Sequence, residues 1–475
     1  MKLKETEIAF LRSIQELEGH TDINKILEWI TERRNSINVN IDLIPFSRLE
    51  KWRFDSLTGN LCHESGRFFS IEGMEVKTNW RKIETWTQPI INQPEIGLLG
   101  IIAKKINGVL HFLMQTKIEP GNINYVQISP TLQATKSNYT KVHKGKTPLY
   151  LEYFIGEKNV TVLLDQLQSE QGARFLKKRN RNIIVEVEGD IPLYDDFCWL
   201  TLGQIKSLMC YDNLVNMDTR TVLSGITFGT LDNVSIDFLS AFMYKDSGQS
   251  NQKMQMLKSA LTEDNSLEPI EQIISWITKL KSKYELELRS LPLNEIKDWI
   301  VTDDEIYHYQ RKYFSVIAAD IHISNREVVS WSQPLVKSAQ EGVIAFLVKK
   351  INGVSHFLVQ AKVEAGNFDI IELAPTVQCL TGNYRKGQNE YDVPFISEVL
   401  EAPEKNILYK AYQSEEGGRF FKEQNLNMII EVNEGFETKV PDNFCWMTLN
   451  QLLTFIKFNN YLNIQARSLI SAIMV

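Results

Sequence analysis

The sequence predicts two related α+β domains in tandem, each with a mixed β-sheet and flanking helices. The chain has 475 residues, more than one ordinary hydrophobic core accommodates. Its second half repeats its first half at a nearly constant spacing of 245 to 247 residues. Within each copy, short β-branched runs alternate with stretches of helical periodicity.

The internal repeat is visible in blocks of identical or similar residues. Residues 104–109 and 349–354 share the sequence KKINGV, a shift of 245. The same shift aligns QSEQGARF at 168–175 with QSEEGGRF at 413–420. Each copy is far longer than a solenoid unit, so the chain is a pair of domains rather than an array. The predicted organisation is a first repeat at 1–226, a linker at 227–268 and a second repeat at 269–475.

The same elements are expected in the same order in both copies. A helical pattern opens each copy, an Asn-Gly hairpin turn leads into a strand, and a later β-branched strand precedes a second helix. In the first and second copy these are the helical patterns at 23–30 and 270–277, the turns at 107–108 and 352–353, the strands at 111–116 and 356–361, the strands at 183–187 and 428–432, and the helices at 203–210 and 450–458. Between the copies, the polar run Lys245–Lys253 predicts a loop.

Composition argues against several classes of function. The net charge is −7, from 59 acidic and 52 basic residues, which does not suit a general nucleic-acid binder. No apolar stretch approaches the roughly 18 residues of a membrane span, and the N-terminus is charged where a signal peptide would be apolar. The five scattered cysteines form no C-x-x-C pair, so we expect no disulfide framework, no zinc site and a cytoplasmic protein.

Motifs for metal catalysis, hydride transfer and nucleotide hydrolysis are not recognisable. No pair of histidines has metal-ligand spacing, and the sequence lacks the glycine-rich dinucleotide and P-loop patterns and the G-x-S-x-G elbow. Metal catalysis, hydride transfer and ATP chemistry therefore have no support in the sequence.

Polar residues that are identical in both copies are candidates for a site, because a matched Glu, Lys or Asn needs a partner or a task. The pattern K-x-E-x-G-N recurs at 117–122 and 362–367, with a structural ion pair at a turn as the alternative. A loop tyrosine recurs at Tyr139 and Tyr384, with packing as the alternative. The QSE block supplies a Glu, an Arg and glycines that permit close backbone approach, with a salt-bridged capping turn as the alternative.

As a set, these blocks resemble the NDP-hexose 2,3-dehydratases, enzymes of 2,6-dideoxysugar biosynthesis. The resemblance covers nearly the whole chain apart from residues 227–268. It rests on the sequences HESGRFF at 63–69, WTQPIINQPEIG at 86–97, EPGN at 119–122, SPTLQATKSNY at 129–139, QSEQG at 168–172, LAPTVQ at 373–378 and QSEEGGRF at 413–420.

The resemblance implies a Nudix-like fold used twice per chain in a homodimer, although this sequence lacks the Glu-rich box of Nudix hydrolases. It also implies a cofactor-free elimination on a dTDP-4-keto-6-deoxyhexose. The C4 ketone acidifies the C3 proton, a base removes it, the enolate expels the C2 hydroxyl, and the enol tautomerises to a 3,4-diketo-2,6-dideoxy sugar. This chemistry needs a base near C3, a donor facing the C4 oxygen and an acid for the leaving hydroxide. Because the diketone is unstable, a 3-ketoreductase is an expected functional partner.

Site roles follow from the resemblance. The base is expected to be Glu170 or Glu415. The group facing the C4 oxygen is expected among Lys117, Tyr139, Lys362 and Tyr384. Arg67, Arg174 and Arg419 are candidates for the diphosphate. Trp86 or Trp331 would stack on thymine, with a core position as the alternative for each. The other expected substrate-binding residues are Asn122, Gln133, Asn138, Asn367, Gln378 and Asn383.

The two copies differ in one loop of the resemblance. Residues 92–95 read NQPE, whereas 337–340 read KSAQ, which favours one competent site per chain without deciding which copy holds it. A non-catalytic nucleotide-sugar-binding module and a diphosphate hydrolase stay open as other functions. Convergence of the candidate glutamates and lysines on open pockets would favour catalysis, and burial in internal ion pairs would favour binding or structure.

Overall fold

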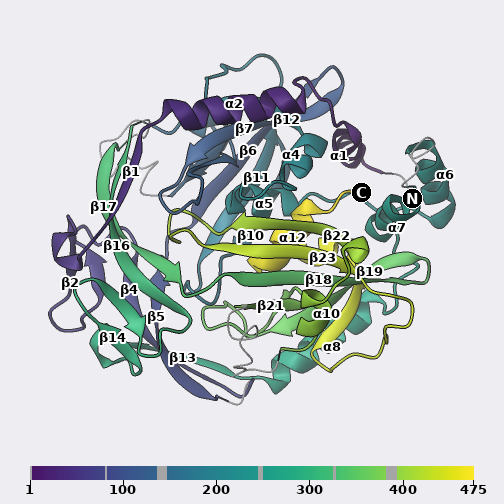
Figure 1. Ribbon diagram of the computed structural model, residues 1–475. Coiled ribbons are helices and arrows are strands. Elements are labelled where there is room, and N and C mark those ends of the chain that lie inside the picture. Colours follow the sequence, from purple (N-terminus) through teal and green to yellow (C-terminus); the bar gives the residue numbers. More distant parts are fainter. Residues whose placement is uncertain (1–2, 81–82, 136–146, 244–249, 325–327, 381–392) are drawn as a thin grey trace.

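The computed structural model describes the chain except for residues 1–2, 81–82, 136–146, 244–249, 325–327 and 381–392. It contains two large and two small β-sheets with helices packed around them (Figure 1). The described helices are α1 Glu5–Gln15, α2 Ile23–Ser36, α4 Leu202–Leu208, α5 Met217–Ser224, α6 Asn233–Met243, α7 Ser250–Leu261, α8 Ile270–Lys283, α10 Ile396–Leu400, α11 Leu449–Ile456 and α12 Ile464–Ala472. None of these is long and apolar enough to cross a membrane.

Each repeat has one large mixed sheet. The first has the order β10-β11-β6-β7-β12 and the second β20-β19-β18-β23-β22, with parallel pairing only between β11 and β6 and between β23 and β18. The first sheet contains β6 Gly97–Ile106, β7 Val109–Ile118, β8 Val126–Ser129, β9 Leu132–Ala134, β10 Thr161–Ser169, β11 Arg179–Glu186 and β12 Phe197–Thr201. The second contains β18 Gly342–Ile351, β19 Val354–Lys362, β20 Glu372–Ala374, β21 Val377–Leu380, β22 Ile407–Ser414, β23 Gln424–Glu431 and β24 Phe444–Thr448.

The elements expected from the sequence are confirmed in both copies. The apolar patterns form α2 and α8, and the later helices are α4 and α11. Both Asn-Gly pairs make tight hairpin turns, since Asn107, Gly108, Asn352 and Gly353 all have positive φ. A turn with two such residues matches the twist of the strands that it joins.

The two small sheets exchange a strand. The first consists of β2 Trp52–Phe54, β3 Leu61–His63, β4 Ser70–Thr78, β5 Thr85–Asn92 and the second repeat's β13 Leu286–Leu291. The other consists of β14 Trp299–Val301, β15 Glu305–His308, β16 Phe314–Ile323, β17 Ser330–Ser338 and the first repeat's β1 Val39–Ile44. Strand β1 lies antiparallel beside β16, and β13 beside β4 (Figure 1). Each repeat therefore completes the small sheet of the other.

The segment between the repeats is more ordered than the expected linker. Residues 227–268 contain α6 and α7. Of the loop expected at Lys245–Lys253, residues 245–249 lie outside the described residues, and the rest is wrong because α7 begins at Ser250. Helix α7 packs on β19 and α11 as α1 packs on β7 and α4. Ser259 Oγ donates to Ser355 O at 2.5 Å, as Ser13 Oγ donates to Leu110 O at 2.5 Å. By its packing, α7 is the second repeat's counterpart of α1.

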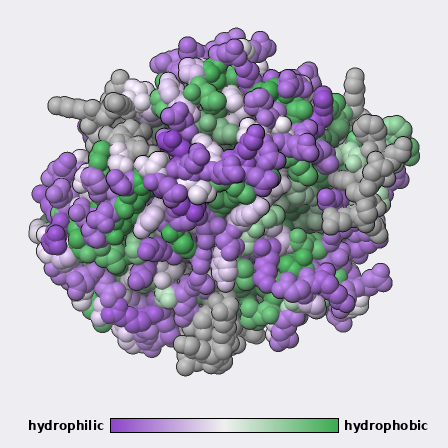
Figure 2. Space-filling view, turned by 45° about the horizontal axis from the view of Figure 1, so that its top comes forward, coloured by the Kyte–Doolittle hydropathy of each residue, from purple (hydrophilic) through white to green (hydrophobic). Residues whose placement is uncertain are grey.

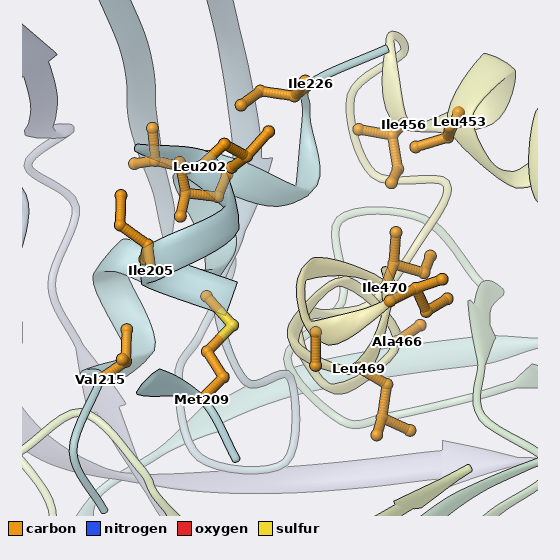
Figure 3. Close-up of a cluster of buried hydrophobic side chains, with 14 of the residues drawn as sticks. Leu202, Ile205, Met209, Val215, Ile226, Leu453, Ile456, Ala466, Leu469 and Ile470 are labelled. Atoms are coloured by element: carbon orange, nitrogen blue, oxygen red, sulfur yellow. The ribbon is translucent and has the colours of Figure 1, made fainter. Parts of the chain in front are cut away.

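The two repeats also share a hydrophobic core. Helices α5 and α12 pack against each other, and side chains around them interlock with those of α4 and α11 (Figure 3). A buried arginine on each helix contacts the other repeat: Arg220 donates to Ser414 O, and Arg467 donates to Ser169 O. On the outside, hydrophilic residues cover most of the face in Figure 2, with hydrophobic residues in scattered patches.

Candidate active site

A cavity of about 500 Å³ lies between the large sheet of the first repeat and residues of the second. The first repeat contributes Lys117 from β7, Gln133 from β9 and Asn180 from β11. The second repeat contributes residues from β17 and from the loop after β22. Aromatic side chains in the lining are Trp52, His63, Phe68, Phe69, Phe175 and Trp331.

Close backbone contacts bring the second repeat to this cavity. Gly121 N donates to Gly417 O at 2.7 Å, and Lys422 N donates to Gly121 O at 2.6 Å. The equivalent Gly366 N donates to Gly172 O at 2.5 Å. A Cβ on Gly121 would overlap the carbonyl oxygen of Phe420, so only glycine allows this approach. Gly172 and Gly417 of the QSE blocks take part in these contacts through their carbonyl oxygens, and the approaching backbone belongs to the other repeat.

Six carboxylates and four cations line the cavity. Glu50, Lys51 and Glu95 are three of these ten groups, and the other seven include the most buried ones. The other carboxylates are Glu119, Glu170 and Asp218 from the first repeat and Glu416 from the second, and the other cations are Lys117, Lys178 and Arg419. Glu170 Oε1 accepts a hydrogen bond from Asn180 Nδ2 at 2.6 Å, and Glu119 Oε1 accepts one from Gln133 Nε2 at 2.6 Å. Among the described residues, no group of three or more His, Cys, Asp or Glu side chains is arranged to hold a metal ion.

Burial raises the pKa values of two cavity carboxyl groups, Glu170 and Glu416. Burial raises the pKa of Glu170, and Arg467, Lys178 and the hydrogen bond from Asn180 oppose that rise. The pKa of Glu416 is raised to about 8, chiefly by burial; Glu119 and Glu170 add to the rise, and Arg419 and Lys178 oppose it. Burial also lowers the pKa of Lys178, against the attraction of Glu170. Such mutually perturbed groups in a cavity are typical of acid–base sites.

In the second repeat the glutamate that matches Glu170 has both carboxylate oxygens hydrogen-bonded. Glu415 accepts hydrogen bonds on both oxygens, from Gln171 and from Asn425. In contrast, the described residues provide a hydrogen bond to only one oxygen of Glu170, and this side chain lines the cavity. Lys362 is buried and lies 3.7 Å from Glu364 in an ion pair. Glu170 and Lys117 therefore converge on an open cavity, whereas Glu415 and Lys362 do not line it.

The other candidates divide into two groups. Trp331, Gln133 and Arg419 also line the cavity, and the Arg419 guanidinium lies 4.2 Å from the ring centre of Phe69. The candidates outside its lining are Arg67, Trp86, Asn122, Arg174, Asn367 and Gln378. Tyr139, Tyr384, Asn138 and Asn383 lie outside the described residues.

The candidates that do not line the cavity are either exposed or held by contacts elsewhere. Arg67 is exposed, and Trp86 packs in a core cluster with Met74 and Val76. Arg174 lies over Phe314, with 4.2 Å between its guanidinium and the ring centre. The asparagines of the two G-N pairs sit at the contact between the repeats: a Cβ on Gly417 would meet Asn122 Oδ1, and one on Gly172 would meet Asn367 Oδ1. Gln378 donates to Glu364 Oε1 at 3.0 Å.

Several charged groups of the cavity were missed in the sequence, and three of them have perturbed pKa values. Lys178, Asp218 and Glu416 all line it. At the matching positions of the other repeat stand Glu423, Gln465 and Gln171. A search for polar residues that are identical in both copies passes over all three. The signal that would have found them is the opposite one, a charged residue present in one copy alone.

Known proteins share this organisation. A family model described as NDP-hexose 2,3-dehydratase matches residues 23–226 and again 270–473. Three curated relatives are each named dTDP-4-dehydro-6-deoxy-alpha-D-glucopyranose 2,3-dehydratase. The relative from Saccharopolyspora spinosa is 46% identical over 94% of this chain and 90% of its own. Those from Amycolatopsis orientalis and Streptomyces violaceoruber are 43% and 40% identical over 94% and 95% of this chain, and 88% and 97% of their own.

The two matched segments coincide with the two repeats, and the relatives align over nearly the full length of this chain. The predicted duplication and the predicted resemblance are both confirmed. This chain belongs to the NDP-hexose 2,3-dehydratase family.

Proposed function

We propose that this protein is a hydro-lyase that removes water across C2 and C3 of dTDP-4-keto-6-deoxyglucose, giving a 3,4-diketo-2,6-dideoxy sugar. Three relatives that align over nearly the whole chain are named for action on this sugar nucleotide. The reaction takes place in the cavity of the first repeat, without a metal or a cofactor.

The observation that carries this proposal is the contrast between Glu170 and Glu415. Glu170 faces the cavity with one oxygen bound by Asn180, so its other oxygen is positioned to accept a proton from a substrate. Glu415 has both oxygens bound by side-chain amides. A general base must reach the proton that it removes, and a raised pKa matches a carboxylate to that task near neutral pH.

The remaining cavity groups suit the other demands of the reaction. The Lys117 ammonium group faces the C4 oxygen and stabilises the negative charge that develops there when C3 loses its proton. Arg419 and Lys178 provide positive charge for the diphosphate. The planar guanidinium group of Arg419 can donate two parallel hydrogen bonds to phosphate oxygens. Trp331 offers an aromatic face for thymine. Two repeats thus build one site.

Four further properties belong to this proposal. We assign each large sheet to a Nudix-like fold, supported by its mixed pairing and flanking helices. We assign a homodimer, which light scattering after gel filtration tests directly. A cytoplasmic location is supported by five free thiols, the usual state of cysteine in a reducing compartment. A 3-ketoreductase is the expected partner, because adjacent ketones make the product reactive.

The test is incubation of the purified protein with dTDP-4-keto-6-deoxyglucose in deuterated water, with a diamine that condenses with adjacent ketones as a trap. The expected result is loss of one water and deuterium at C2 of the trapped product. No loss of water, with dTDP still raising the melting temperature, would instead support the non-catalytic binding module. Release of dTMP would support diphosphate hydrolysis.

A further inference from the structure

The cavity holds more carboxyl groups than its cations can balance. Glu119, Glu170 and Asp218 are at most 6% exposed, and Glu416 is partly buried beside them. A buried carboxylate is stable only when cations or hydrogen-bond donors compensate its charge, and like charges in one site force some groups to keep their protons. One or more of the four must therefore be neutral near pH 7.

Asp218 is the least compensated of the four. Glu170 has the charges of Arg467 and Lys178 and a hydrogen bond from Asn180. Glu416 has Arg419 and Lys178, and Glu119 receives the hydrogen bond from Gln133.

For Asp218 the balance is reversed. Burial raises its pKa well above the usual range, repulsion by Glu119, Glu416 and Glu170 adds to this rise, and Lys117 alone lowers it. Its place in the first turn of α5 favours the charged form, but it faces three carboxylates across the cavity. A carboxyl group in these surroundings keeps its proton.

We propose that Asp218 is the general acid that protonates the C2 hydroxyl as it leaves. This inference rests on the proposed 2,3-dehydration and adds the acid that the reaction requires. A carboxylic acid held neutral in a cavity that also contains the base Glu170 gives the two opposite protonation states that an elimination uses.

The proton balance closes with these two groups. Glu170 takes the proton from C3, and the electron pair of the C3–H bond forms the enolate. The enolate expels the C2 oxygen as the C2–O bond breaks, and the Asp218 proton makes the departing group water. In the tautomerisation that follows, the proton on Glu170, which exchanges with solvent, goes to C2 and the proton of the C3 hydroxyl returns to Asp218. Both carboxyl groups are then in their starting states.

The matching helix of the second repeat supports the assignment, because it has no acidic residue at this position. Asn216 caps α5 through Thr219 N at 2.8 Å, and Asn463 caps α12 through Ala466 N at 2.9 Å. The two helices thus begin in the same way. Two positions after the cap, however, Gln465 stands where the first repeat has Asp218. A side-chain amide keeps the shape of a carboxylic acid but does not act as a proton donor of this kind.

The test compares leaving groups in the Asp218→Asn variant, whose side chain has nearly the same shape. With the C2-hydroxyl substrate we expect turnover to fall about 10²-fold or more, the usual contribution of a general acid. With the 2-deoxy-2-fluoro analogue, fluoride leaves without a proton, so fluoride release should stay within about tenfold of the unmodified enzyme. Exchange of the C3 proton with deuterated water should also persist, because Glu170 is intact.

Control variants separate this inference from the proposed function. Gln465→Asn alters the matching position of α12 and should leave both rates unchanged, with melting temperatures recorded for every variant. Equal losses with the hydroxyl and fluoro substrates, or near-normal turnover with the hydroxyl substrate, would overturn the role of Asp218. A fluoride-specific rescue in Glu416→Gln instead would assign the acid to Glu416. Absence of C3 exchange in the unmodified enzyme would contradict the proposed function itself.

Discussion

The two repeats share one fold and one set of matched polar residues, yet they differ in what surrounds the central glutamate. In the first, Glu170 faces a cavity with cations nearby. In the second, two amide groups bind both oxygens of Glu415, and the position of Lys178 is taken by Glu423. A duplicated framework has thus been kept in both copies, whereas the charges needed for chemistry lie around one of them.

The second repeat is nevertheless part of the site. It contributes Trp331, Glu416 and Arg419 to the cavity, and its buried Arg467 lowers the pKa of Glu170. It also completes the small sheet of the first repeat with β13. Each repeat therefore contributes residues to the cavity and a strand to the small sheet of the other. The predictions below test this division.

Separation of the halves should have the largest effect. Residues 1–226 and 227–475, expressed alone, each lack one strand of a small sheet and expose the shared core of α5 and α12. We expect neither half to give a cooperative thermal transition, and we expect co-expression to restore one. Circular dichroism melts of each half and of the pair measure this. Two independently stable halves would show that the strand exchange is dispensable.

The glutamate pair should separate catalysis from stability. In Glu170→Gln the amide oxygen can still accept the hydrogen bond from Asn180, so the fold should persist while turnover falls about 10³-fold or more. In Glu415→Gln the new NH₂ group faces an amide donor, so stability should fall by about 1–3 kcal/mol. Its turnover should change little.

The measurements are kcat and the denaturant midpoint of unfolding for both variants. Equal losses of turnover in the two variants would contradict a single competent site. A stable, inactive Glu415→Gln variant would move the base to the second repeat.

The tandem α+β repeats and their main helices and strands were predictable from the sequence, because the duplication shows each local pattern twice. The Asn-Gly turns, the opening helices and the strand around Ile183 follow from local preferences and appear in both copies. The exchange of β1 and β13 does not follow from such patterns. A strand pairs equally well with its own repeat or with the other one, and the choice depends on tertiary packing.

The site was only partly predictable for a related reason. Residues kept in both copies include Glu170 and Lys117, but also Asn122 and Asn367, which the contact between repeats retains. Asp218 and Lys178 differ between the copies and were passed over. Selection for shared packing acts on both repeats, whereas selection for chemistry in one cavity acts on one of them.

Substitutions of Arg419 and Arg67 should have effects of intermediate size on KM. Arg419→Gln removes a cation of the cavity, and we expect KM for the sugar nucleotide to rise about 10- to 100-fold, with a smaller change in kcat. Arg67→Gln changes an exposed residue outside the lining and should leave KM within about twofold. Steady-state kinetics at constant ionic strength measure both. A larger rise of KM for Arg67→Gln would place the diphosphate outside this cavity.

The smallest effect is expected in the pH dependence of stability. The pKa of Glu416 is about 8 in the folded protein, chiefly because of burial, against a usual value of 4.5. Between these two values the folded state holds a proton that the unfolded state has lost. Stability therefore falls as pH rises through this window, by up to about 1.4 kcal/mol per pH unit for one group.

In Glu416→Gln that share of the slope should vanish, a difference of about 1 °C in Tm per pH unit for a chain of this size. Glu404→Gln, at an exposed glutamate paired with Lys410 at 2.9 Å, is the matched control and should keep the original slope. Parallel slopes in all three proteins would mean that Glu416 is ionised in the folded state across this range, and that the second repeat supplies negative charge to the cavity.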